Sequence, residues 1–509
     1  MELKPMKLGL SLLLITTLST AAFAENKEQW LEPDVKTSRT EHNVRVKGKK
    51  IEYMAVAGDT LIYDQQGKAK AQIFSTAYFR DDVKNKSNRP ISFIFNGGPG
   101  SSSVWLHMGI FGPKWVKLPS DAKNPGAPPY ELANNPYSLL DVTDLVFIDP
   151  VGTGYSKAVG HAKGKDFWGV KEDAEVLAKF IRQFITEHKR WNSPKYIGGE
   201  SYGTTRAGAL VKELQEGWGS IDLNGVILIS AILDFQTGDF TPGNDLPFVS
   251  FLPTYAATAW YHRALPAQTQ ALPLAELVQQ VREFAIEEYS VALLKGGLMS
   301  AEETRDIAKK LHQFTGLSEE YLLQTRLRID EFRFMKELLR SRSVAVGRLD
   351  SRFLGDEADD AGERFEADPS GYGIDGAYTV LVNDYLHNTL LYQRNSKYHV
   401  LSGEVFRNWK WSLGGNPRNE GAINVTPFIA KGMRQNKDLR VFVANGYYDL
   451  ATPFFATEIS LNHYDIDSQR VDMHYYEAGH MMYIHHPSLQ KLSEDLRNFY
   501  RKGSSNNDR

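Results

Sequence analysis

The stretch "KYIGGESYGTTRAGALVKELQ", residues 195–215, decides the fold. An apolar segment runs into Gly198 and Gly199, Ser201 and Gly203 follow, and the chain continues with helical character. Glycine lets a chain turn sharply where a side chain would not fit. The stretch therefore predicts a strand, a tight turn and a helix. The turn has two possible interpretations: it is of no chemical interest, or it holds Ser201 at a strained corner where the hydroxyl can react.

Short apolar segments on both sides of this stretch predict further strands: "ISFIF" from Ile91, "LVFID" from Leu145, "GVILIS" from Gly225 and "RVFVANG" from Arg440. Continuous apolar runs are typical of strands covered on both faces. Segments 51–56 and 71–79 have an alternating, strand-like pattern and predict antiparallel strands at a sheet edge. Between the second and third apolar segments, apolar residues recur at helical spacing. These residues are Val176, Leu177, Phe180, Ile181, Phe184 and Ile185. The alternation predicts an α/β fold with a mostly parallel central sheet and helices on both faces.

The pattern changes between about residues 236 and 430, where helical segments dominate (267–294, 301–314 and 318–341). We therefore predict a core in two parts, residues 25–235 and 431–509, separated by a large, mainly helical cap insertion at 236–430. The acidic segment "GDEADDAGERFEADPSGYGIDG" lies inside this insertion. It lacks the aspartate spacing of a calcium-binding loop, so we predict a solvated loop.

The first 24 residues have the pattern of an export signal. Lys4 and Lys7 precede a short apolar run at 8–18, and Ala22-Phe23-Ala24 forms an A-x-A cleavage site. The alternative is a membrane anchor, but the run is too short to span a bilayer comfortably. We therefore predict an exported protein, periplasmic or secreted, that has no membrane segment once residues 1–24 are removed.

The composition limits the classes of partner and of stabilising bond. The 509 residues carry a net charge of −3 without long basic blocks, which argues against a nucleic-acid partner. The chain contains no cysteine, which excludes disulfides and a lipid-modified cysteine. The predicted large core must therefore stabilise the exported protein alone.

Residues Gly199 to Gly203 match G-x-S-x-G at the predicted strand-to-helix turn, where a nucleophilic serine is expected. Such a serine needs a base, and the base needs an orienting acid. In α/β-hydrolases these residues follow in the order Ser, Asp, His. Asp449 follows the strand-like segment at Arg440, in "NGYYDLATP", and His480 follows another, in "VDMHYYEAGHMMY". Each alone is compatible with an ordinary loop residue, but their order and their positions after strands predict a catalytic triad.

A second glycine cluster, "FNGGPGSSSVW" at 95–105, follows the predicted strand at Ile91. It is compatible with a simple turn. A serine hydrolase, however, needs a backbone N–H in the loop after an early strand to complete its oxyanion hole. Gly97 and Gly98 allow close approach of a substrate, and Pro99 stiffens the loop.

Five motifs together resemble the serine carboxypeptidases, a branch of the α/β-hydrolases. They are "NGGPGSSS", "NPYSLLDVTDLVFIDPVGTGYS", "GGESYG", "NGYYDLATP" and "AGHMMY", in family order over about residues 90–235 and 438–490. The resemblance implies an α/β-hydrolase fold and an exported, bacterial-type enzyme without cofactor or metal. It implies Ser201 as nucleophile, His480 as general base and then acid, and Asp449 as the partner that orients His480.

The resemblance also implies binding roles near Ser201. The backbone N–H groups of Gly98 and Tyr202 would form the oxyanion hole, and Asn96 and Glu200 would bind the C-terminal carboxylate of a peptide. A carboxylate repels another unless one is protonated, so this role needs a Glu200 whose pKa is raised by burial and by the bound anion. We therefore expect substrate binding to weaken as pH rises.

The chain departs from the family pattern at two positions. The family usually has a second glutamate in an E-L-G-P context, whereas this chain has "IFGP", with Ile110 at the position of the acid. Ser101 stands where a cysteine is usual after G-G-P-G. The first change removes a partner with which Glu200 would share its proton; neither touches the triad.

The favoured function is a serine carboxypeptidase that hydrolyses the C-terminal peptide bond through an acyl-enzyme on Ser201. A serine esterase or acyltransferase with the same triad is the alternative, and Ile110 supports it. A metal hydrolase using His480, His485 and His486 lacks a carboxylate at the required spacing. A non-catalytic binding protein on the same fold is the fourth hypothesis. Side-chain preference and oligomeric state stay open.

Overall fold

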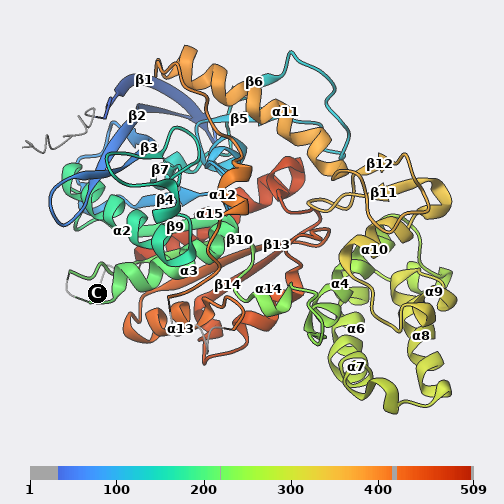
Figure 1. Cartoon of the computed structure of the whole chain (residues 1–509). Helices are drawn as coiled ribbons and strands as arrows, with labels where there is room; N and C mark the ends of the chain where they lie inside the picture. The colour runs from blue at the N-terminus through green and yellow to red at the C-terminus, as the bar shows by residue number, and fades with distance from the viewer. Residues whose placement is uncertain (1–32, 218, 415–420, 506–509) are drawn as a thin grey trace, which may run out of the picture. The chain divides into compact units, whose positions relative to one another are not determined.

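A computed structural model describes residues 33–217, 219–414 and 421–505 (Figure 1). The predicted signal peptide, residues 1–24, lies outside the described residues. Within them, one sheet has the strand order β1-β2-β3-β7-β4-β9-β10-β13-β14, and β8 pairs with β3. The strands are β1 (Thr37–Val46), β2 (Lys49–Tyr63), β3 (Ala69–Arg80), β4 (Ile91–Phe95), β7 (Asp144–Ile148), β8 (Lys157–Ala158), β9 (Lys195–Ser201), β10 (Gly225–Ala231), β13 (Arg440–Gly446) and β14 (Val471–Tyr476).

The sheet is parallel from β7 to β14 and antiparallel at the β1 edge. Strands β7, β4, β9, β10, β13 and β14 pair in parallel, while β1, β2 and β3 pair antiparallel and β3 joins β7. The apolar segments predicted as central strands are all strands, and segments 51–56 and 71–79 lie in the antiparallel edge. Both predictions are confirmed.

Helices cover both faces of the sheet, as predicted. Helices α2 (Val170–Glu187), α3 (Tyr202–Gln215) and α13 (Thr426–Gln435) contribute to one apolar cluster, and α15 (His486–Ser505) contributes to the other. Successive strand residues point to opposite faces, so Phe93 and Phe95 belong to the first cluster and Ile94 to the second. The apolar residues of α2 at helical spacing are all buried. Because the strands from β7 to β14 pair in parallel, their carboxyl ends lie at the same edge of the sheet. A binding or catalytic site is expected at this edge.

The helical segment after β10 has its own core. Figure 1 shows α4, α6, α7, α8, α9 and α10 grouped together, and their apolar residues form a third cluster with Tyr448, Leu450 and Phe454, which follow β13. The bounds are α4 (Leu246–Tyr261), α5 (Ala267–Gln270), α6 (Leu274–Phe284), α7 (Ser290–Lys295), α8 (Ala301–Thr315), α9 (Glu319–Gln324) and α10 (Glu331–Glu337). This segment therefore packs directly on the loop that carries Asp449. The domain boundaries at 235 and 430 stay a prediction.

Two features of the insertion differ from the predictions. A short hairpin, β11 (Val344–Val346) and β12 (Leu354–Asp356), lies within it, although strand character was expected only from Arg440. The end of the acidic segment forms α11 (Pro369–Asp384), capped by the side chain of Asp368, rather than a solvated loop. The helix was not predicted because the segment contains several glycines, and glycine is a poor helix former. Local sequence also carries no information on tertiary packing.

The remaining elements are short or lie beside the sheet. They are α1 (Val104–Leu106), the π-helical turn η2 (His107–Phe111), β5 (Lys114–Lys117), β6 (Glu131–Asn134), α12 (Gly403–Arg407), α14 (Phe454–Leu461) and the 3-10 turn η11 (Met482–Ile484). No helix in the described ranges is long and apolar enough to cross a membrane.

Candidate active site

Ser201 lies at a sharp turn between β9 and α3, where the strand-turn-helix prediction placed it. Its backbone has φ 60° and ψ −133°, a conformation that costs a non-glycine residue free energy. The neighbouring glycines are required by space: a Cβ on Gly199 would lie 2.1 Å from the carbonyl oxygen of Gly203. Ser201 is partly exposed, whereas Glu200 and Tyr202 on either side are buried. The turn thus leaves Ser201 partly exposed to solvent while its two neighbours are buried.

Asp449, Thr452 and His480 form what we call the base corner. Asp449 Oδ1 accepts from the backbone N–H groups of Ala451 (2.9 Å) and Thr452 (3.0 Å). Its Oδ2 accepts from the Thr452 hydroxyl and from His480 Nδ1, both at 2.8 Å. An ionised carboxylate can only accept, so the proton of the neutral imidazole lies on Nδ1 and Nε2 is free to act as a base.

Ser201 and His480 are brought together through the sheet. Ala231 of β10 pairs with Ser201, and the preceding residue, Ser230, donates its hydroxyl to the carbonyl oxygen of His480 at 2.7 Å. Within the described residues, the Ser201 hydroxyl is not hydrogen-bonded to the His480 ring. Catalytic hydrogen bonds of this kind often tighten only when substrate binds.

Burial and charge act on the imidazole of His480 in opposite directions. Burial lowers its pKa, while the carboxylates of Asp449 and Glu200 raise it, and the net result is a pKa above the ordinary 6.5. Arg348 opposes this rise through its positive charge. A protonated imidazole at this position is therefore stabilised by two carboxylates.

A loop of the insertion, residues 348–352, holds both loops of the base corner. The backbone N–H of His480 donates to the carbonyl oxygen of Leu349 at 2.6 Å. Leu450 N–H donates to Arg348 O at 3.0 Å, and Ser351 N–H donates to Tyr448 O at 2.9 Å, on the two sides of Asp449. The insertion thus sets the positions of both Asp449 and His480.

Asn96, Glu200 and Tyr483 form a second group, the carboxylate corner. Tyr483 donates its hydroxyl to Glu200 Oε2 at 2.6 Å, and the side chain of Asn96 is also hydrogen-bonded to Glu200. The pKa of Glu200 is raised to about 7, mainly by burial and also by the charge of Asp449. The charge of His480 and the two hydrogen bonds oppose this rise. Glu200 therefore changes its charge near neutral pH.

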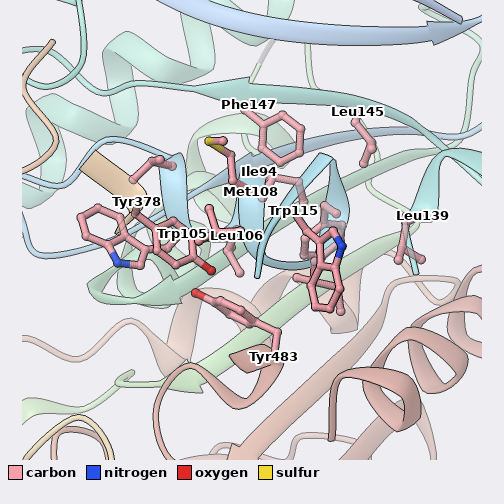
Figure 2. Packing of buried hydrophobic residues seen from close by; sticks show 14 of the residues in the cluster. Ile94, Trp105, Leu106, Met108, Trp115, Leu139, Leu145, Phe147, Tyr378 and Tyr483 are labelled. Atoms are coloured by element: carbon pink, nitrogen blue, oxygen red, sulfur yellow. The ribbon is translucent and has the colours of Figure 1, made fainter. Parts of the chain in front are cut away.

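Ile110 lies in an apolar environment. It is fully buried in the cluster that also contains Trp105, Tyr378 and Tyr483, shown from close by in Figure 2. The side chain of Ile110 is apolar. The polar contact at this residue is made by its backbone, where the Asn135 side chain donates to the carbonyl oxygen of Ile110 at 2.7 Å. The position at which the resemblance predicts the family's second acid thus holds a side chain that packs in the apolar core.

The glycine loop after β4 lies against the Ser201 turn. A Cβ on Gly97 would lie 2.6 Å from the backbone nitrogen of Tyr202, and Gly98, the next residue, has φ +100°. Arg206 of α3 donates to the carbonyl oxygen of Asn96 and forms a 2.5 Å ion pair with Asp173 of α2. The expected oxyanion-hole donors, the N–H groups of Gly98 and Tyr202, therefore belong to two segments packed against each other.

The three histidines of "HMMYIHH" have different partners. His480 bonds Asp449, His485 Nδ1 lies 2.8 Å from Ser488 Oγ, and the His486 ring centre lies 5.4 Å from that of Trp115. No group of three His, Asp or Glu residues in the described part of the chain is arranged to hold a metal ion.

The structure adds residues that the motifs did not single out. Thr452 and Tyr483 lie within two of the quoted motifs, three residues after Asp449 and His480, but nothing in the sequence marks them as hydrogen-bond partners. Ser230 appeared only as a strand residue. Leu349 acts through its backbone, so its side chain carries no signal of this contact.

The family model described as serine carboxypeptidase matches residues 63–338. "Serine carboxypeptidase-like 13" of Arabidopsis thaliana is 30% identical over 31% of this chain and 36% of the relative, and "Serine carboxypeptidase-like 20" of the same plant is 32% identical over 27% of each. The matched stretch thus spans about a third of these curated relatives.

A solved structure shares the fold. The crystal structure of Kex1(delta)p, a prohormone-processing carboxypeptidase from Saccharomyces cerevisiae, covers 87% of this chain and 91% of that chain with a TM-score of 0.53 at 14% identity. At this identity the likeness concerns the fold alone. Since the family model matches more than half of the 509 residues, this chain belongs to the serine carboxypeptidase family.

Proposed function

We propose that this protein is an exported serine carboxypeptidase that releases the C-terminal residue of a peptide through an acyl-enzyme on Ser201. The observation that carries the proposal is Glu200, a buried acid with a pKa raised to about 7 that directly precedes the serine. A general hydrolase does not need a titrating acid at this place, whereas an enzyme that recognises a free carboxylate does. The predicted signal sequence at 1–24 is the basis for export.

The proposed reaction begins with proton transfer. The Ser201 hydroxyl attacks the carbonyl carbon of the last peptide bond while His480 Nε2 accepts the hydroxyl proton. Asp449 keeps the imidazole oriented and stabilises its charged form. The N–H groups of Gly98 and Tyr202 donate to the oxyanion of the tetrahedral intermediate, where such donors are worth about 10²–10³-fold in rate each.

The second half releases both products. His480 returns its proton to the leaving amine, so the C–N bond breaks and the C-terminal amino acid departs. Water then attacks the acyl-enzyme with His480 as base, and the shortened peptide leaves with a new carboxylate. Asn96 and the protonated Glu200 donate hydrogen bonds to the carboxylate of the residue that is released.

The two corners require opposite protonation states. His480 must be neutral to accept a proton, and Glu200 must be protonated to bind an anion. The ionised Glu200 raises the pKa of His480. Protonation of Glu200 removes this contribution, so the enzyme form that can bind substrate also holds a His480 that loses its proton more readily.

A serine esterase or acyltransferase is the second candidate. The buried Ile110 favours it, because the family's second acid is absent from the carboxylate corner. The alternative keeps Ser201, Asp449 and His480 in their roles and removes the requirement for a free carboxylate.

The test compares a blocked dipeptide with the same dipeptide amidated at its C-terminus, across pH 4 to 8, with Ser201→Ala as blank. We expect strong preference for the free acid at low pH and no activity of the variant. Equal rates on both substrates, or activity on esters alone, would replace the carboxypeptidase by the esterase or acyltransferase. Absence of Ser201 labelling by a fluorophosphonate probe would refute both enzymes.

A further inference from the structure

Tyr483 lies where it can direct the proton of Glu200. It belongs to η11, three residues after His480, and is 1% exposed. Its ring packs against Gly109, where a Cβ would lie 2.4 Å from the ring atoms. Gly109 directly precedes Ile110 in η2. The segment that lacks the family's second acid is thus the segment that makes room for the phenol.

The tyrosine is surrounded by groups that keep it protonated. Burial, the charge of Glu200 and the neighbouring Tyr378 hold the pKa of Tyr483 well above its ordinary value. Figure 2 shows the hydroxyl groups of Tyr483 and Tyr378 directed toward each other, with Trp105 nearby, and the rings of Trp105 and Tyr378 stack at 6.2 Å. The Tyr483 hydroxyl therefore keeps its proton, which it donates to Glu200 Oε2.

A phenol and a carboxylic acid act differently on a neighbouring carboxyl group. A second acid exchanges donor and acceptor roles with its partner. A neutral phenol keeps its own hydrogen, and in this structure Tyr483 donates that hydrogen to Glu200 Oε2. When Glu200 takes up a proton, Oε2 stays the accepting oxygen and the proton is placed on Oε1. Oε1 is then the oxygen with a hydrogen to donate.

We propose that Tyr483 is the positioning residue for recognition of the substrate's C-terminal carboxylate: by donating to Glu200 Oε2, it places the Glu200 proton on Oε1, from which the proton can be donated to the anion, and it takes the place of the acid absent at Ile110. This inference rests on the proposed carboxypeptidase function and names the residue that makes its substrate recognition work without a second acid.

Tyr483→Phe separates this role from packing, because it removes the hydroxyl and keeps the ring on Gly109. The KM for the free-acid dipeptide at pH 5 should rise about five- to tenfold, the size of one ordinary hydrogen bond. The kcat should stay within about twofold, since the base corner is untouched. Loss of the donor raises the pKa of Glu200, so the pH at which KM begins to rise should move upward.

Tyr378→Phe is the matched control. Tyr378 is equally buried and feels the charge of Glu200, but within the described residues it is not hydrogen-bonded to it. We expect neither a change in KM at pH 5 nor a shift in its pH dependence. Fluorophosphonate labelling of Ser201 at the wild-type rate verifies that both variants are folded at the active site.

The outcomes separate the two proposals. If the wild-type enzyme prefers the free acid but Tyr483→Phe keeps the wild-type KM and pH dependence, the role of Tyr483 is refuted and the carboxypeptidase stands. Equal losses on the free acid and on the amidated dipeptide, or equal losses in Tyr378→Phe, would also refute it, because they indicate packing. A wild-type enzyme that cleaves acid and amide equally refutes the proposed function itself.

Discussion

The two corners of the site each hold one buried carboxylate, but they supply it with different donors. Asp449 accepts from two backbone N–H groups, from Thr452 and from His480. Glu200 accepts from the side chains of Tyr483 and Asn96, and burial raises its pKa to about 7. Four donors hold the carboxylate of Asp449 in a fixed orientation against the His480 ring. Glu200 has fewer donors, and burial is the main cause of its raised pKa. Under the proposed function, Asp449 serves catalysis and Glu200 serves recognition, so substitutions should affect kcat at the base corner and KM at the carboxylate corner.

The largest effect should come from Asp449→Asn, which breaks the base corner. An amide at this position favours the wrong tautomer of His480, so kcat should fall by about 10³–10⁴-fold while KM changes little. Steady-state kinetics at pH 7 on the free-acid dipeptide measure both. A loss of less than about tenfold would remove Asp449 from the triad.

Gly97→Ala should disturb the expected oxyanion donors and the carboxylate corner together, because the new Cβ would lie 2.6 Å from Tyr202 N and 2.7 Å from Glu200 O. A displacement of the oxyanion donors should lower kcat/KM by about 100-fold. Gly297→Ala is the control, since nothing lies within 4 Å of its Cβ. Thermal unfolding of both variants distinguishes a displaced loop from an unfolded protein. Wild-type kcat/KM in Gly97→Ala would show that the contact relaxes without cost to the site.

Glu200→Gln should remove the pH dependence of KM that arises at the carboxylate corner, because glutamine resembles the protonated acid at every pH. The neutral form of Glu200 binds the anion, and it is lost as pH rises through a pKa of about 7, so wild-type KM should rise about tenfold between pH 6 and pH 8. The variant should keep nearly the same KM at both pH values. Glu331→Gln, a partly buried acid of α10 whose pKa burial also raises to about 7, should leave the wild-type pH dependence in place.

Removal of the Glu200 charge should also change the pKa of His480 in the base corner. Ionised Glu200 raises the pKa of His480 in the free enzyme, so Glu200→Gln should move the midpoint of Ser201 labelling by a fluorophosphonate probe, which needs a neutral His480 but no substrate carboxylate, to lower pH. A midpoint that does not move would mean that the two corners are independent.

The smallest effect is expected from Arg348→Met in the insertion. The charge of Arg348 lowers the pKa of His480, so its removal raises this pKa and moves the acid limb of kcat to higher pH. The kcat at pH 6 should fall by less than about threefold, because the charge acts at a distance. Arg305→Met, an exposed residue of α8, serves as the control. A rise of kcat at pH 6 would contradict the sign of this effect.

Local patterns were sufficient to predict most of the core. Apolar runs and helical spacing report directly on burial, so the strands at Ile91, Leu145, Lys195, Gly225 and Arg440 were found where the structure has them. The turn at Ser201 was predictable because glycines mark positions without room for a side chain. The hairpin β11–β12 and helix α11 were missed because their stability comes from tertiary contacts rather than from local propensity.

The sequence by itself determined the sheet, the order of Ser201, Asp449 and His480 along the chain, and the glycines that let two loops approach, because each depends on residues close to one another in the chain. Only the tertiary structure decided which groups surround the two carboxylates. Tyr483 reaches Glu200 across 283 positions, and Leu349 of the insertion holds His480 through a backbone carbonyl. Contacts of this kind join segments that are remote in the chain. A backbone donor or acceptor is also the same at every residue, so a local sequence pattern cannot predict these contacts.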